Sequence, residues 1–137
     1  MTLWLVDTSV AVPAVLASHV AHQVVNRWIG HRVLHLPAHA LIETYSVLTR
    51  LPGGARLLPS DAAQLIGERF GPPVMLDAES TSNLIDELAK ANIAGGAVYD
   101  ALVAITVLKA GGTLATRDAR AAATYRLLNV NYELVVE

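Results

Sequence analysis

Leu3-Trp4-Leu5-Val6-Asp7-Thr8-Ser9 is the stretch of sequence that decides the fold. Its four consecutive apolar residues predict a short strand that is buried on both faces, as strands of parallel sheets are. The strand stops at the carboxylate of Asp7, and an apolar helical pattern follows. Because open α/β sheets bind ligands beyond the carboxyl ends of their strands, Asp7 is a candidate site residue. Aspartate is an equally good helix N-cap, so the sequence leaves both roles open.

The composition is that of a globular chain with more apolar residues than its own core needs. Of its 137 residues, 53% are hydrophobic and 16% are charged, whereas about a quarter is usually charged. We therefore expect a single domain over residues 1–137, with part of its apolar surface covered by another subunit or a partner. The net charge of −2 lacks the basic excess that is typical of nucleic-acid-binding proteins. Any contact with RNA must then rest on local arginines.

Cysteine and long apolar segments are both absent from the sequence. Without cysteine, disulfides and thiolate sites are excluded, which is compatible with a reducing cytoplasm. No apolar run approaches the roughly 20 residues that cross a bilayer, and the N-terminus lacks the basic start of a secretory signal. We expect a cytoplasmic protein with no membrane contact.

Strands and helices alternate along the chain, separated by short breaks rich in glycine and proline. The patterning predicts strands at 3–6, 32–36, 74–76, 113–116 and 133–136. It predicts helices at 10–17, 19–29, 38–51, 60–70, 79–92, 97–110 and 119–128. This alternation is typical of an α/β fold in which helices cover both faces of a parallel sheet.

Four acids call for a specific explanation. Asp118 repeats the pattern of Asp7, because it also follows an apolar strand and a hydroxyl residue, and it too could be only a helix cap. Asp100 lies in a predicted helix with almost no other polar residue, and Glu43 is the only acid of its predicted helix. A buried carboxylate without a partner is costly and tends to take up a proton.

A hard divalent cation would make such a group of acids tolerable. Mg²⁺ or Mn²⁺ takes oxygen ligands from one or two carboxylates and reaches others through water. A bound cation also lowers the pKa of water, orients a phosphodiester and stabilises its developing charge. Four acids without a cysteine or histidine cluster therefore favour metal-assisted phosphodiester hydrolysis. The candidate catalytic and metal-binding residues are Asp7, Glu43, Asp100 and Asp118.

Several neighbours of these acids are further candidates. Ser9 and Thr116 could orient the carboxylates, although both are more typical of helix caps. Arg117 and Arg50 could hold RNA phosphates. The alternative for Arg117 is an ion pair with one of the acids, and the alternative for Arg50 is a place in a solvated loop. Tyr45 or Tyr99 could stack on a base, and for Tyr99 a core position is favoured.

Three histidines with helical spacing do not predict a metal site. His31, His35 and His39 are four residues apart, which on one helix would align them on a single face. Pro37 interrupts that helix, so the alignment fails.

The sequence resembles the PIN-domain family, and in particular the VapC toxins of bacterial toxin–antitoxin pairs. The resemblance covers the whole chain and rests on Leu5–Ser9, Ile42–Thr44, Tyr99–Leu102 and Ala115–Asp118, in this order. It implies a three-layer α/β/α fold with a central, mainly parallel five-stranded sheet. It also implies an endoribonuclease dependent on Mg²⁺ or Mn²⁺, whose metal is held by the acids that match Asp7, Glu43, Asp100 and Asp118.

The same resemblance implies partners. It predicts a homodimer that cleaves cellular RNA and is neutralised by a cognate VapB-type antitoxin, whose C-terminal segment covers the active site. Asp118 matches the acid that varies most among relatives. The competing function is a catalytically silent binding module whose acidic pocket docks a basic segment of a partner. Such a module would bind equally well with all metal chelated and would never cut RNA.

Overall fold

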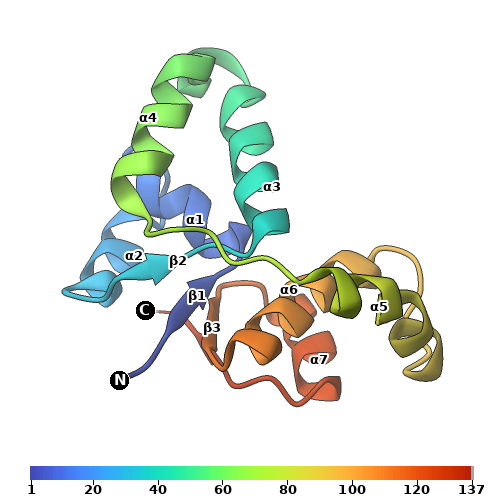
Figure 1. The fold of residues 1–137 in the computed structure, drawn as a ribbon. Helices are drawn as coiled ribbons and strands as arrows, with labels where there is room; N and C mark the ends of the chain where they lie inside the picture. The colour runs from blue at the N-terminus through green and yellow to red at the C-terminus, as the bar shows by residue number, and fades with distance from the viewer. Residues whose placement is uncertain (137) are drawn as a thin grey trace.

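The computed structural model describes residues 1–136, and within them the centre of the molecule is a sheet of four parallel strands (Figure 1). The strands are β1 (Trp4–Val6), β2 (Leu34–His35), β3 (Thr113–Thr116) and β4 (Tyr132–Leu134), in the spatial order β2-β1-β3-β4. β1 is central, because Leu5 pairs with His35 on one side and with Leu114 on the other. The strands are parallel, so their carboxyl ends share one edge of the sheet.

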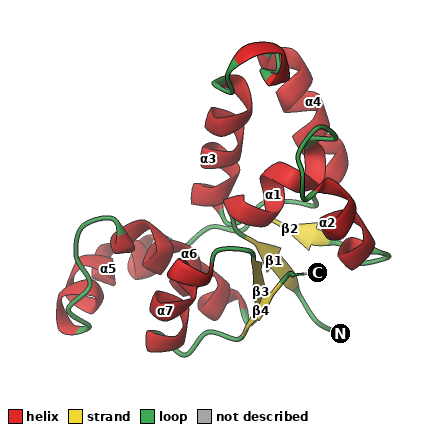
Figure 2. Cartoon of the chain, turned by 180° about the vertical axis from the view of Figure 1, so that it is seen from behind, coloured by secondary structure: helices red, strands yellow, loops and turns green. Residues whose placement is uncertain are grey.

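Helices lie on both faces of this sheet, which confirms the expected three-layer α/β/α architecture (Figure 2). One group consists of α1 (Thr8–Val15), α2 (His22–Ile29), α3 (Ala38–Thr49) and α4 (Pro59–Arg69). The other consists of α5 (Ala78–Lys90), α6 (Ala97–Ala110) and α7 (Ala119–Leu127). The 3-10 turn η1 (Gly53–Ala55) joins α3 to α4, and these two helices form an arm that rises from the sheet. Within residues 1–136, none of the helices combines the length and apolar character needed to span a bilayer.

The prediction of a fifth strand is wrong. Val74 meets Pro37 in a single parallel bridge, with backbone hydrogen bonds of 2.9 and 2.8 Å to the residues on either side of that proline. Proline has no backbone N–H, and Pro72-Pro73 directly precede Val74. Because α5 already begins at Ala78, the chain has no room to extend this bridge into a ladder.

Most predicted elements are present with shifted ends. α6 and β3 have the predicted bounds, 97–110 and 113–116. The helix predicted from residue 19 begins only at His22, since the backbone N–H of Ala21 is held by the ring of His19 at 3.0 Å. The core lies between β1, β3 and the helices that cover them, and Leu5, Val6 and Leu114 are fully buried in it.

A close approach between β1 and the turn after α6 gives a test of this packing. A Cβ on Gly112 would overlap the side chain of Leu5 and lie 2.9 Å from the carbonyl oxygen of Leu3. We expect Gly112→Ala to lower the free energy of unfolding by about 1–3 kcal/mol, measured by urea denaturation. Gly67→Ala is the control, because nothing lies within 4 Å of a Cβ there, and it should add about 0.4–1 kcal/mol. Wild-type stability in Gly112→Ala would contradict the close approach.

Candidate active site

A small acidic pocket opens at the carboxyl edge of the sheet. It holds about 70 Å³ and lies where α1, α6 and α7 begin, beside the first turns of α3. Its lining residues are Asp7, Thr8, Ser9, His39, Glu43, Tyr99, Asp100, Val103, Asp118 and Tyr125. All four acids predicted from the sequence are therefore brought together. A larger hollow of about 750 Å³ lies at the opposite ends of the strands, against Trp4 and Arg32, and the described residues that line it include no carboxylate side chain.

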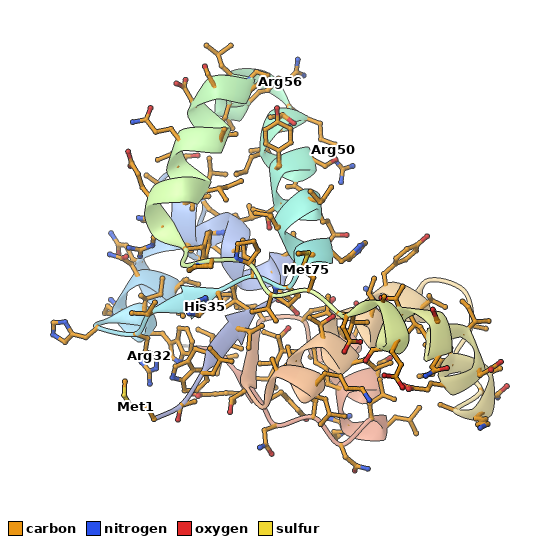
Figure 3. All side chains as sticks on the ribbon, in the orientation of Figure 1. Met1, Arg32, His35, Arg50, Arg56 and Met75 are labelled. Carbon is orange, nitrogen blue, oxygen red and sulfur yellow. The ribbon has the colours of Figure 1, made fainter. Side chains whose placement is uncertain are left out.

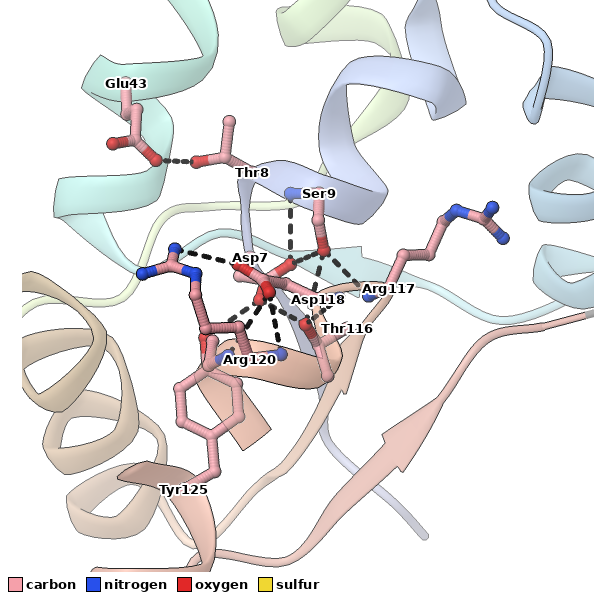
Figure 4. Close-up of polar contacts among 10 residues, drawn as sticks. Asp7, Thr8, Ser9, Glu43, Thr116, Arg117, Asp118, Arg120 and Tyr125 are labelled. Carbon is pink, nitrogen blue, oxygen red and sulfur yellow. Dashed lines mark hydrogen bonds and ion pairs between the residues drawn. The ribbon is translucent and has the colours of Figure 1, made fainter. Parts of the chain in front are cut away.

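Asp7 is the most tightly held of the four acids. It ends β1 and caps α1, and it is only 6% exposed. Its Oδ1 accepts hydrogen bonds from the backbone N–H and the hydroxyl of Ser9, at 3.1 and 2.5 Å. Its Oδ2 accepts from the hydroxyls of Thr116 and Tyr125, the latter at 2.8 Å (Figure 4). Capping and a place in the site, which the sequence left as alternatives, are therefore both features of this residue.

The environment of Asp7 opposes its negative charge. Burial raises the pKa of Asp7 above its ordinary value, and hydrogen bonds from Ser9, Thr116 and Tyr125 partly counter that rise. Ser9 and Thr116 also contact each other at 3.2 Å and so join the ends of β1 and β3. The structure thus places both predicted orienting residues against the carboxylate that they were expected to orient.

Glu43 faces the pocket from the second turn of α3. Its Oε1 accepts a hydrogen bond from the hydroxyl of Thr8 (Figure 4). Its Oε2 lies 3.9 Å from Nε2 of His39, one helical turn earlier on the same face of α3. The side chain is 46% exposed, so Glu43 stands at the mouth of the pocket.

Asp118 and Asp100 complete the acidic group from α7 and α6. Asp118 caps α7, since its Oδ1 accepts from the N–H groups of Arg120 and Ala121 at 3.0 and 3.2 Å. Its Oδ2 lies 3.3 Å from the guanidinium of Arg120. Asp100 is half-buried in the first turn of α6, and among residues 1–136 we find no hydrogen bond to its carboxylate. Asp100 is thus the acid whose oxygens are free.

The four acids influence one another. Burial raises the pKa of Asp100, the charge of Arg120 lowers it, and the charges of Asp118, Asp7 and Glu43 raise it again. This mutual repulsion, and a donor set made of carboxylate and hydroxyl oxygens, fit a hard divalent cation such as Mg²⁺ or Mn²⁺. Within residues 1–136, however, no three acids or histidines converge tightly enough to form a finished metal site.

Neither of the two arginines predicted to contact RNA lines the pocket. Arg117 extends away from the acids (Figure 4), and its guanidinium donates to the carbonyl oxygen of Val135 at 2.8 Å. Arg50 follows the last turn of α3, at the far end of the arm formed by α3 and α4 (Figure 3). In the described residues Arg120 is the arginine that pairs with one of these acids, and the sequence pattern did not point to it.

Three further polar residues of the pocket were not predicted as site residues from the sequence. Tyr125 lies seven residues after Asp118, on the same side of α7 as the buried Ala121, and this spacing was a usable signal. His39 stands four residues before Glu43, which also places both on one face of a helix. Thr8 had no signal beyond its place directly after Asp7. The core position favoured for Tyr99 is wrong, since this residue is 58% exposed.

Removing the Tyr125 hydroxyl tests whether Asp7 depends on it. Tyr125 is 1% exposed, so its hydrogen bond to Oδ2 is shielded from bulk water. We expect Tyr125→Phe to cost about 2 kcal/mol of stability in urea denaturation, because the bond reaches a buried, charged acceptor. Tyr132→Phe is the matched control, since among residues 1–136 the hydroxyl of Tyr132 bonds to the exposed Arg126 alone. This substitution should change stability by less than about 0.5 kcal/mol. Equal stability of both variants would refute this role of Tyr125.

The pKa of Asp100 predicts an unusual dependence of stability on pH. Because the folded protein raises this pKa above its ordinary value of 3.8, ionisation disfavours the folded state, and stability is lost as the pH rises through the folded pKa. In chelator, we expect Asp100→Asn to raise the melting temperature at pH 7 by on the order of 2 °C, a gain that vanishes below the ordinary pKa. Asp86→Asn, on the exposed side of α5, should show no such gain. A lower melting temperature of Asp100→Asn at pH 7 would contradict the repulsion.

Comparisons with known proteins agree with this architecture. A family model described as the PIN domain matches residues 4–127. Ribonuclease VapC27 of Mycobacterium tuberculosis is 52% identical over 126 residues, which cover 92% of this chain and 92% of the relative.

Solved structures show the same fold at lower sequence identity. VapBC2 from Rickettsia felis, bound to a DNA fragment from the promoter, superposes with a TM-score of 0.68 at 15% identity, over 97% of this chain and 98% of that chain. VapC20 of Mycobacterium tuberculosis, described as a toxin that cleaves the sarcin-ricin loop, gives 0.66 at 19% identity, over 88% and 93%.

Proposed function

The chain belongs to the PIN-domain family, and from this premise we propose that it is a VapC-type toxin that cleaves cellular RNA as a metal-dependent endoribonuclease. One observation carries the proposal: Asp7, Glu43, Asp100 and Asp118 come from four separate elements and line one pocket at the carboxyl edge of the sheet. Ribonuclease VapC27, at 52% identity, supports the reaction type. VapC20, a toxin that cleaves the sarcin-ricin loop, supports a structured RNA as the target.

The acids of the pocket have distinguishable roles in this mechanism. The residues that would hold Mg²⁺ or Mn²⁺ are Asp7, Glu43, Asp100 and Asp118, and a bound cation would activate water and stabilise charge on the phosphate. Asp7, fixed by hydrogen bonds to Oδ1 and Oδ2, provides the rigid reference point of the site. Asp100 has free oxygens that can also accept the proton of the attacking water. Arg120 can turn from Asp118 to a phosphate, since its side chain is 79% exposed.

Partners of the toxin are part of the same proposal. VapBC2, a structural neighbour, was solved as a toxin–antitoxin complex, and a VapB-type antitoxin would neutralise this chain in the cytoplasm. Exposed apolar side chains on several elements are candidate contacts for the antitoxin and for a second copy of the chain. Ile42, Leu58, Met75 and Ile85 are each at least 66% exposed.

A catalytically silent binding module is the second candidate. It is favoured by the finding that Asp7, Glu43 and Asp118 already accept hydrogen bonds from the chain itself. Such a pocket could dock a basic segment of a partner with no metal present. The two candidates therefore differ in their dependence on a divalent cation.

Cleavage of RNA by purified protein separates the two functions. We expect the wild type to fragment RNA in Mg²⁺ or Mn²⁺ and to lose this activity in chelator. Asp100→Asn should lose at least about 100-fold in rate because it removes one of the carboxylates proposed to hold the cation. Mg²⁺ should raise the melting temperature of the wild type and leave that of Asp100→Asn unchanged. Expression of the wild type should also arrest growth, and Asp100→Asn should not.

The control for this experiment is Asp86→Asn, which removes one charge from α5 and should cleave like the wild type. Equal cleavage by Asp100→Asn would defeat the assignment of that residue. A wild type that never cuts RNA with either cation, and binds its partner equally in chelator, would establish the silent module instead.

A further inference from the structure

A stacked pair of rings borders the acidic pocket. The imidazole of His39 and the phenol of Tyr99 have centroids 5.1 Å apart and planes inclined by only 12°. His39 lies in the first turn of α3, four residues before Glu43, and Tyr99 directly precedes Asp100 in the first turn of α6. Both residues line the pocket. The pair therefore links the two helices that supply half of the proposed catalytic acids.

Tyr99 is more exposed than packing alone explains. The residue is 58% exposed, although one face of its ring is covered by His39. A ring that buries so little apolar surface contributes little to the stability of the free protein. Tyr45, the other tyrosine near Glu43 in sequence, does not line the pocket. Of the two tyrosines, only Tyr99 thus offers a free aromatic face beside the acids.

The Nε2 atom of His39 is a second and independent observation. It is buried from solvent and has no hydrogen-bond partner among residues 1–136. The carboxylate of Glu43, at 3.9 Å, is too distant for a hydrogen bond. Buried polar atoms in proteins are almost always paired. This nitrogen can therefore form a hydrogen bond with a ligand that reaches the rim of the pocket.

The size of the pocket decides where such a ligand lies. A volume of about 70 Å³ accommodates ions and a few water molecules. A nucleobase is too large to enter and must rest on the rim, where Tyr99 presents its ring. Aromatic side chains accept unpaired bases of any sequence in this way, because every base has a π-face. A base is favoured over an aromatic residue of a protein partner, since the ring adjoins the acids proposed to act on the phosphate attached to that base.

We propose that Tyr99, supported from behind by His39, is the platform on which an unpaired RNA base next to the cleaved phosphate stacks, with Nε2 of His39 bonding to the same nucleotide. The proposal rests on the proposed ribonuclease function and specifies its substrate as RNA with unpaired nucleotides at the cleavage point. Tyr99 and His39 are then binding residues, and the chemistry stays with the acids.

Binding of a fluorescein-labelled, single-stranded oligoribonucleotide tests the platform. The full chain is used in the Asp100→Asn background with Mg²⁺, so that RNA is bound without being cut. We expect Tyr99→Leu to weaken binding by roughly ten-fold, the effect of losing one stacked base, and Tyr99→Phe to bind like the parent. The same oligonucleotide with abasic sites should bind the parent and Tyr99→Leu equally. His39→Phe keeps the stacked ring without the nitrogen, and it should lose part of the affinity for the intact RNA.

The control is Tyr45→Leu, an exposed tyrosine of α3 outside the pocket, which should bind like the parent. Parent-like binding by Tyr99→Leu would overturn the proposal and leave a protein partner as the occupant of the ring. An equal loss on abasic RNA would overturn it as well, because the ring would then not contact a base. In both cases cleavage of RNA by the wild type would keep the ribonuclease function intact, whereas a wild type that cuts no RNA would remove both.

Discussion

The hydrogen bonds to Asp7 are the constraint on which the rest of the site depends. A carboxylate that is 6% exposed is costly, and here Ser9, Thr116 and Tyr125 satisfy both of its oxygens. These donors come from α1, β3 and α7, so the same bonds that keep the charge tolerable also fix three elements around the end of β1. Folding and the geometry of the pocket are therefore coupled through one side chain.

The other three acids are held less tightly than Asp7, and to different degrees. Asp118 is held by the first turn of α7 and by Arg120, and Glu43 by a single hydroxyl. Asp100 is free of hydrogen bonds in the described residues, and burial and the charges of its neighbours raise its pKa. Such a pocket stores electrostatic repulsion in the free protein. A divalent cation relieves that repulsion, which gives the pocket a reason to bind one.

The sequence predicted the fold and the grouping of the acids correctly where the evidence was hydrophobic periodicity or the position of a strand end. The bounds of α6 and β3 could be predicted because their apolar runs end near paired glycines or a carboxylate. The four acids could be predicted because they lie at strand ends or in otherwise apolar helices. Side-chain direction was harder to predict. In Thr116-Arg117-Asp118 successive residues alternate sides, so Arg117 turns away while its neighbours face Asp7 and α7. The fifth strand is absent because Pro72 and Pro73 have no N–H groups to extend the bridge at Val74 on one side, and α5 begins at Ala78 on the other.

Tyr125 also bears on when the pocket can exist during synthesis. Asp7 is translated before Thr116 and Tyr125, which follow it by 109 and 118 residues. A nascent chain that still lacks α7 has no donor from Tyr125 and no carboxylate from Asp118, so its acids cannot yet be assembled. The pocket can therefore be complete only once α7 has been synthesised.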